Sequence, residues 1–203
     1  SSELTRYGTP MAPMLMPHWT DGCIGSMEGL YFESSTTTPF HFLIQSELST
    51  APSRAQRDLP YRSFDIDAGI DHLQQFGVKY YAASSQVATE KAKQHSSLTQ
   101  IANSGPWTIF KVKNSELVTQ LDFEPAVFTQ LEHSEWLDPS VEIFQKGSQA
   151  VVRTLGGMDH WQYVDLEEEP ERIGLPRVEI SEINVDTDRI EFKVDEIGVP
   201  VIV

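Results

Sequence analysis

The residues best suited to chemistry lie together near the N-terminus, within residues 16–42. This stretch mixes aromatic rings, carboxylates, two histidines, three glycines and a run of hydroxyl side chains. Glycines and hydroxyls bury little apolar area, so the mixture is typical of a loop held against something polar, such as a sugar, an ion or a partner. The candidate binding residues are Trp19, Asp21, Glu28, Tyr31, Glu33 and His41.

A carbohydrate ligand is the first interpretation of this stretch. Aromatic faces stack on the C–H surfaces of sugars, while carboxylates accept hydrogen bonds from sugar hydroxyls. Trp19 and Tyr31 supply rings, and Asp21, Glu28 and Glu33 supply carboxylates. The alternative is that the aromatic side chains anchor a long loop onto the core, and the sequence alone does not separate the two.

Two enzymatic alternatives start from the same region. Glu28 and Glu33 resemble the carboxylate pair of a glycoside hydrolase, but a spacing of five places them on opposite faces of a strand. His18, Asp21 and His41 add hard ligands for a metal-assisted hydrolase, yet no H-x-x-x-H or H-x-H motif is present. A glycine-rich phosphate loop, a nucleophile elbow and a Cys–His pair are also missing. We therefore expect no cofactor, and we assign no metal ligand or catalytic residue.

Charge limits the class of partner. Fifteen basic against thirty acidic residues give this chain of 203 residues a formal net charge of −15. Such a field repels polyanions, so we expect no nucleic acid partner and no anionic lipid surface. Cys23 is the only cysteine, which excludes an internal disulfide and a thiolate zinc cage. No apolar run approaches the roughly 20 residues that cross a bilayer.

The elements that must position these residues begin after an irregular N-terminal arm. A helix is predicted over residues 39–48, with Thr38 as its N-cap and a proline in its first turn. A second helix carries Ile66, Ile70 and Leu73 on one face. Gly77 follows where a helix C-terminus favours a left-handed residue.

A small sheet is predicted next. Its elements are a strand over residues 78–83, a polar helix over 86–95, strands over 98–101 and 107–112, and edges at 116–121 and 126–128. In the strand that starts at Trp107, Ile109 and Lys111 share its face, while Phe110 and Val112 lie on the other face. We interpret Trp107, Trp136 and Trp161 as core packing or as packing between elements. This order predicts an α/β or α+β fold, a mixed sheet with flanking helices.

The C-terminal part predicts a helix and a β-hairpin. The helix covers residues 138–145 and is closed by Gly147, and Ile190, Phe192 and Val194 alternate in the second strand of the hairpin. We divide the chain into an α/β domain, residues 1–130, and a smaller region, 131–203, which alternatively continues the same domain. Because the chain stops inside an apolar run, residues 198–203, we expect a piece of a longer protein.

Several stretches resemble one family of large polytopic membrane proteins from actinobacteria. They are WTDGCIGSMEGLYFE at residues 19–33, TTPFHFL at 37–43, LQQFGVKYY at 73–81, SGPWTIF at 104–110, IEFKV at 190–194 and GVPV at 198–201. This family carries a C-type glycosyltransferase-like membrane region and is described as related to 6-pyruvoyl-tetrahydropterin synthase domains. The matches run in order over most of the chain.

The resemblance implies an extracytoplasmic domain of a membrane glycosyltransferase-like protein in an organism with an elaborate glycolipid envelope. No residue here matches the catalytic acid of such transferases, so the resemblance assigns no catalytic role. It favours recognition of a cell-envelope glycan or glycolipid acceptor. The alternatives are an interaction domain that packs on its own transmembrane region without a ligand, and a metal-assisted hydrolase.

Overall fold

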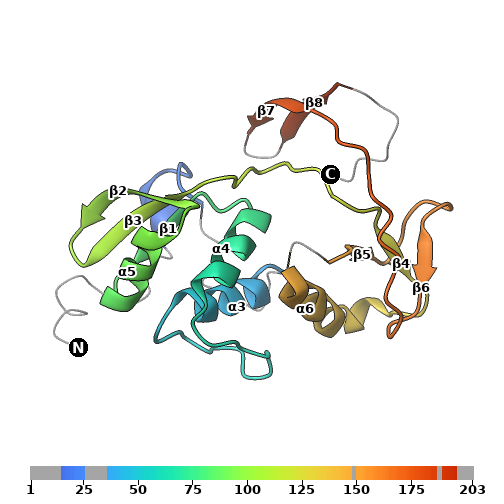
Figure 1. Ribbon diagram of the computed structural model, residues 1–203, viewed down its shortest axis with the longest axis horizontal. Helices are drawn as coiled ribbons and strands as arrows, with labels where there is room; N and C mark the ends of the chain where they lie inside the picture. Colours follow the sequence, from blue (N-terminus) through green and yellow to red (C-terminus); the bar gives the residue numbers. More distant parts are fainter. Residues whose placement is uncertain (1–14, 26–35, 148–149, 187–188, 196–203) are drawn as a thin grey trace. The chain divides into compact units, whose positions relative to one another are not determined.

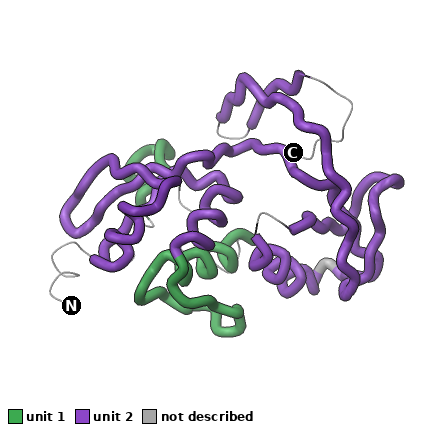
Figure 2. Tube along the Cα trace, in the orientation of Figure 1, with its two compact units in different colours: residues 1–65 green, residues 66–203 purple. Residues whose placement is uncertain are grey.

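The computed structural model describes residues 15–25, 36–147, 150–186 and 189–195 (Figure 1). The chain divides into two compact units, residues 1–65 and 66–203 (Figure 2). The fold is mixed α/β with a C-terminal antiparallel hairpin, as predicted. The domain boundary expected near residue 130 falls inside the second unit.

The described residues of the first unit include the helices α2 (Met16–Trp19) and α3 (Thr38–Leu48). The predicted helix over 39–48 is confirmed, although Thr37 occupies the N-cap position and Thr38 lies in the first turn. The apolar side chains of Phe42, Leu43 and Ile44 are all buried. Pro39 fits this first turn because the backbone N–H that proline lacks has no partner there in any helix.

The second unit begins with two helices and a three-stranded antiparallel sheet. The elements are α4 (Ile66–Gln75), β1 (Tyr80–Ala83), α5 (Gln86–Gln94), β2 (Leu98–Ser104) and β3 (Trp107–Val112). The strand order is β1-β3-β2, so β3 lies between the two strands that α5 connects. Helix α5 contacts β1 and β2, and α4 contacts β3 and α5. Each of these elements was predicted, but β2 extends beyond the expected residue 101 to Ser104.

Local chemistry sets the ends of these helices. Gly77 has a φ of 63°, and Val78 N donates to Leu73 O at 2.9 Å, which closes α4 as the sequence predicts. At the start of α5, the Ser85 hydroxyl oxygen accepts a hydrogen bond from Ala88 N at 3.2 Å. Both caps satisfy backbone groups that a helix leaves without internal partners.

A second sheet is parallel, and the sequence did not predict it. Strand β4 (Ala126–Phe128) lies between β5 (Arg153–Thr154) and β6 (Gln162–Val164). The 3₁₀ helix η3 (His133–Glu135) and helix α6 (Leu137–Lys146) lie between β4 and β5 in the chain. The prediction of residues 126–128 as an edge is wrong, because β4 has a partner on both sides. Residues 116–121, the other expected edge, form no strand.

The core of this sheet is small and tightly packed. Ala126, Val151 and Val164 form one buried cluster. Trp161 is buried, as predicted, and a Cβ added to Gly157 would lie 2.3 Å from its Cε3 atom. Only glycine fits at this approach of the chain to the indole ring.

The C-terminal hairpin pairs β7 (Ile180–Val185) with β8 (Ile190–Val194), as predicted. The register places Ile180 opposite Val194 and Val185 opposite Ile190. Within the described ranges, no helix is both long and apolar enough to span a membrane.

Candidate functional site

Two of the predicted binding residues lie in one short turn of the first unit. Trp19 ends α2, and the residue is 59% exposed. Asp21 and Gly22 have φ values of 51° and 80°, so the backbone takes two left-handed steps in succession. The turn is held by Gly22 N, which donates to Pro17 O at 2.8 Å. The turn therefore presents an exposed indole next to an exposed carboxylate.

Of the other predicted residues, the structure describes His41 alone. His41 lies on α3, where it is half-buried and its ring centroid is 5.6 Å from that of Phe42. Glu28, Tyr31 and Glu33 lie outside the described residues, so their part of the prediction stays a prediction. Among the described residues, no three His, Cys, Asp or Glu side chains gather as metal ligands would.

A second candidate surface lies on the β1-β3-β2 sheet. Tyr80, Ala82, Ile109 and Lys111 share one face because the register pairs Tyr80 with Lys111 and Ala82 with Ile109. We call this surface the open face. By register and alternation its residues are Tyr80, Ala82, Thr99, Ala102, Ser104, Trp107, Ile109 and Lys111.

Neighbouring residues of the same strands fill the opposite face. Tyr81, Phe110 and Val112 are buried there. The Tyr81 and Phe110 rings stack with centroids 6.1 Å apart, and burial raises the pKa of the Tyr81 phenol to about 12. The adjacent tyrosines therefore have different roles: Tyr81 belongs to the core, whereas Tyr80 faces outward.

The open face exposes two aromatic rings. Tyr80 is 55% exposed and Trp107 is 38% exposed. Trp107 is therefore not a core residue, and of its predicted role only packing between elements stays a prediction. Lys111, opposite Tyr80, lies four residues from Trp107 on β3, so about 14 Å of strand separates the two ends of the face. The side chains of Ala82 and Ile109 lie between these ends.

Strand β2 adds two hydroxyl groups to the open face. Thr99 pairs with Lys111, and Ser104 pairs with Trp107. The register shifts between Gln100 and Ala102, which marks Ile101 as a bulge residue, and Ile101 is 50% exposed. The open face is thus an apolar strip with a hydroxyl beside each end.

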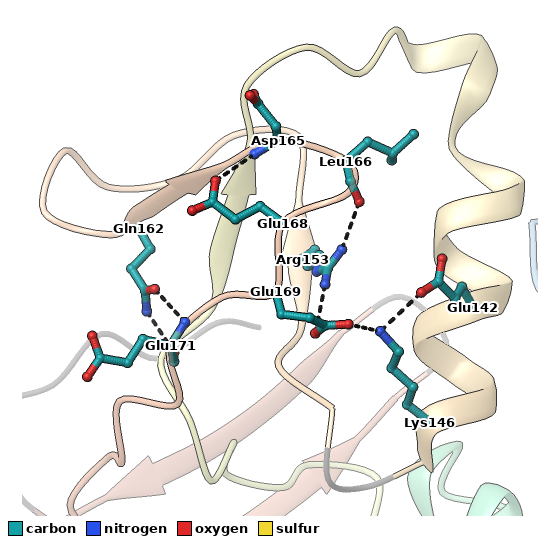
Figure 3. A network of polar contacts seen from close by, with 9 residues as sticks. All are labelled: Glu142, Lys146, Arg153, Gln162, Asp165, Leu166, Glu168, Glu169 and Glu171. Carbon is teal, nitrogen blue, oxygen red and sulfur yellow. Dashed lines mark hydrogen bonds and ion pairs between the residues drawn. The ribbon is translucent and has the colours of Figure 1, made fainter.

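The third candidate is a cluster of charges on the parallel sheet (Figure 3). Glu169 forms ion pairs with Lys146 of α6 and with Arg153 of β5, and Lys146 also pairs with Glu142 at 3.1 Å. We call these four residues the Glu169 cluster. The Arg153 side chain is only 5% exposed, lies 5.5 Å from the Phe128 ring centroid, and donates to Leu166 O at 3.5 Å.

The electrostatics of the Glu169 cluster indicate a structural role. The hydrogen bond from Lys146 is the main cause that lowers the pKa of the Glu169 carboxyl, and the same bond raises the pKa of Lys146. Each group is thereby held in its charged form. The cluster ties the loop after β6 to α6 and β5, and Gln162 reinforces this loop through two hydrogen bonds of 2.8 Å with the Glu171 backbone.

Comparison of the chain with protein-family models, curated proteins and solved structures finds no match. The family resemblance in the sequence therefore stays an expectation. Of the three surfaces described above, only the open face combines exposed rings and flanking hydroxyls on the strands of one sheet. Part of this signal is present in the sequence, since Trp107, Ile109 and Lys111 alternate, but nothing in that pattern tells which face is covered.

Proposed function

We propose that this chain is a non-catalytic glycan-recognition domain of a membrane glycosyltransferase-like protein, and that it works outside the membrane. One observation carries the proposal: Tyr80 and Trp107 expose their rings at opposite ends of one sheet face. The family resemblance supplies the expected location, and the open face supplies the binding chemistry.

Sugars suit this face because of its shape and its chemistry. A pyranose ring presents C–H bonds that pack on an aromatic face, and an extended oligosaccharide needs several such contacts along a line. The strip from Trp107 past Ile109 to Tyr80 has this form. The hydroxyls of Thr99 and Ser104 are placed to exchange hydrogen bonds with sugar hydroxyls at the rims of the strip.

Residues 16–42, which we call the opening stretch, enter this proposal as a second contact region. Trp19 and Asp21 offer a ring and a carboxylate in the exposed turn after α2. Whether they bind the same glycan is a separate question, so each surface is tested with its own variant.

Titration calorimetry with neutral oligosaccharides of glucose, mannose and galactose tests the proposal. We expect Tyr80→Ala and Trp107→Ala each to weaken binding about tenfold, which is the size of one lost aromatic contact. Tyr163→Ala is the matched control, because Tyr163 is also 50% exposed but lies on β6. The proposal fails if the unmodified chain binds none of these sugars, or if both open-face variants bind as the control does. Trp19→Ala, measured alongside, tests the opening stretch independently.

A second candidate function is docking onto the membrane region of the same parent protein. The hairpin favours it, because Ile180, Val185, Ile190 and Val194 line one face of a sheet with two strands among the described residues, and both Val185 and Ile190 are exposed. A two-stranded hairpin alone is marginally stable in water. In this case the detergent-solubilised membrane region should co-purify with the chain and lose it on Ile190→Lys, whereas Glu191→Gln on the opposite face should leave the complex intact.

A further inference from the structure

We propose that Lys111 makes the open face selective for anionic glycans, meaning saccharides that carry carboxylate or phosphate groups. This inference rests on the proposed function and narrows its ligand class. It concerns one residue whose position, charge and surroundings distinguish it from the other cations of the chain.

The first observation is the position of Lys111 in the sheet. It sits on the central strand β3, with Tyr80 opposite on one side and Thr99 opposite on the other. Directly opposed side chains on neighbouring strands have Cβ atoms about 5 Å apart. A ring, an ammonium and a hydroxyl thus form one row across the strip, and a sugar stacked on Tyr80 would place its substituents within reach of the ammonium.

The second observation is that Lys111 is exposed and makes no ion pair with any carboxylate of the described chain. Three other lysines are occupied, since Lys146 and Lys193 pair with glutamates and Lys113 donates to Ser96 O at 2.7 Å. Lys79, Lys91 and Lys93 also form no ion pair among the described residues, so the position of Lys111 on the sheet is what distinguishes it. Lys111 is also the only charged residue among those that the register assigns to the open face. Its charge is therefore available to a ligand.

The third observation is how charge is distributed along the chain. Residues 66–121 contain five Lys and four Asp or Glu, whereas residues 122–203 contain six Lys or Arg and nineteen Asp or Glu. The region that carries the open face has a net charge of +1, and the region after it has −13. An anion repelled by most of this protein is not repelled by this sheet.

The four carboxylates within residues 66–121 do not cancel the positive charge of Lys111 on the open face, because three of them belong to the helices. Asp67 and Asp71 lie on α4, and Glu90 lies on α5. These helices contact the sheet, and the sheet face opposite the open face is the buried one. Asp67 also pairs with His95 at 3.2 Å. The fourth, Glu116, follows β3 and lies outside the open face.

The expected contribution of Lys111 is moderate. An exposed ammonium–carboxylate pair changes an equilibrium constant by at most about fivefold, and salt screens it. The stacking on Tyr80 and Trp107 holds the sugar, and Lys111 then discriminates among the sugars that fit. Specificity of this kind is a difference between two affinities, so it is measured with a matched ligand pair.

The test titrates the full chain with an oligogalacturonate and with the same oligosaccharide after complete methyl esterification, which removes the charge and keeps the sugar backbone. A phosphorylated oligomannose and its dephosphorylated form make a second pair, so that the two sources of negative charge are distinguished. We expect the unmodified chain to prefer at least one acidic form about threefold to fivefold at low salt, with the preference lost at 0.5 M salt.

The variants assign the preference to a residue. Lys111→Gln should bind the acidic and neutral forms equally, Lys111→Arg should keep the preference, and Lys93→Gln on α5 is the matched control. Equal binding of the acidic and neutral forms by the unmodified chain overturns the inference and leaves the proposed function standing. A preference that survives in Lys111→Gln also overturns it. If none of the four sugars binds, this inference fails, and the titration with neutral oligosaccharides of glucose, mannose and galactose decides separately whether the proposed function fails.

Discussion

Replacing Glu169 with glutamine isolates the charge of a residue that joins helix α6 to strand β5 of the parallel sheet. Glu169 contacts Lys146 of α6 and Arg153 of β5 through its two carboxylate oxygens. Glutamine keeps the size of the side chain and one acceptor oxygen, but it removes the negative charge. The effect of the substitution is therefore electrostatic rather than steric.

The size of the effect follows from the unequal exposure of the partners. The Glu169 side chain is 69% exposed, and a pair between fully exposed groups would be worth at most about 1 kcal/mol. The Arg153 side chain is 5% exposed, and stranding a fully buried charge costs about 3–5 kcal/mol. Arg153 keeps its bond to Leu166 O, so we expect an intermediate loss of about 1–2 kcal/mol in the free energy of unfolding.

The pH dependence gives the sharper check. The pKa of Glu169 is lowered in the folded chain, so its contribution is fully present above the unfolded-state pKa of about 4.3 and disappears as the pH falls through the folded value. The pKa of Lys146 is raised, so its contribution is present below about 10.4 and is lost as the pH rises through the folded value. The difference between the unmodified chain and Glu169→Gln should be constant near neutral pH and should vanish in strong acid.

Urea unfolding at pH 7 and in strong acid, followed by far-ultraviolet circular dichroism, measures this difference. Glu167→Gln serves as the control, because Glu167 is an exposed neighbour in the same loop and forms no ion pair with a described residue. An equal loss for Glu169→Gln at both pH values would refute the electrostatic explanation. So would a loss at pH 7 no larger than that of Glu167→Gln.

Three further predictions concern the stability of single elements: a glycine contact, a helix cap and the C-terminal hairpin. Gly157→Ala should lower the free energy of unfolding by about 1–3 kcal/mol, because the added Cβ would lie 2.3 Å from Trp161, and the thermal midpoint of unfolding measures this loss. Gly156→Ala is the control and should be close to neutral, because its added Cβ would have no atom within 4 Å. Ser85→Ala should cost about 1 kcal/mol in urea unfolding through the lost cap of α5, and Ser84→Ala should cost less. In hydrogen exchange, the amides of β7 and β8 should exchange faster than those of β3, because two strands alone protect poorly; equal protection would mean that another layer covers the hairpin.

The parts of the fold that the sequence predicts are those with local signals. Helix α4 shows its apolar stripe at Ile66, Ile70 and Leu73, and Gly77 marks its end. Strand β3 shows a period of two on both faces. In each case the residues that predict the element lie within about ten positions of one another, so the local pattern is enough to predict it without tertiary contacts.

The missed parts depend on contacts between distant residues. Strands β5 and β6 have two and three residues, too few for any periodicity to appear. They pair with β4 across 27 residues in the case of Ala126 and Arg153, and nothing local encodes that pairing. The exposure of Trp107 has the same cause, because alternation separates two faces but does not identify the face that a helix layer covers. The binding roles of Glu28 and Glu33 in the opening stretch stay a prediction, because both residues lie outside the described residues.

The uneven distribution of charge along the chain bears on which anionic partners can bind the open face. A net charge of −15 describes the whole chain, yet residues 66–121 carry +1, so average repulsion does not by itself exclude an anionic ligand from the open face. What argues against nucleic acid there is the number of cations. Binding a phosphate backbone draws on several Lys or Arg contacts, each of which releases counterions, whereas the open face offers Lys111 alone. One ammonium beside the Tyr80 ring suits a ligand with few charges and much C–H surface, such as a short acidic oligosaccharide.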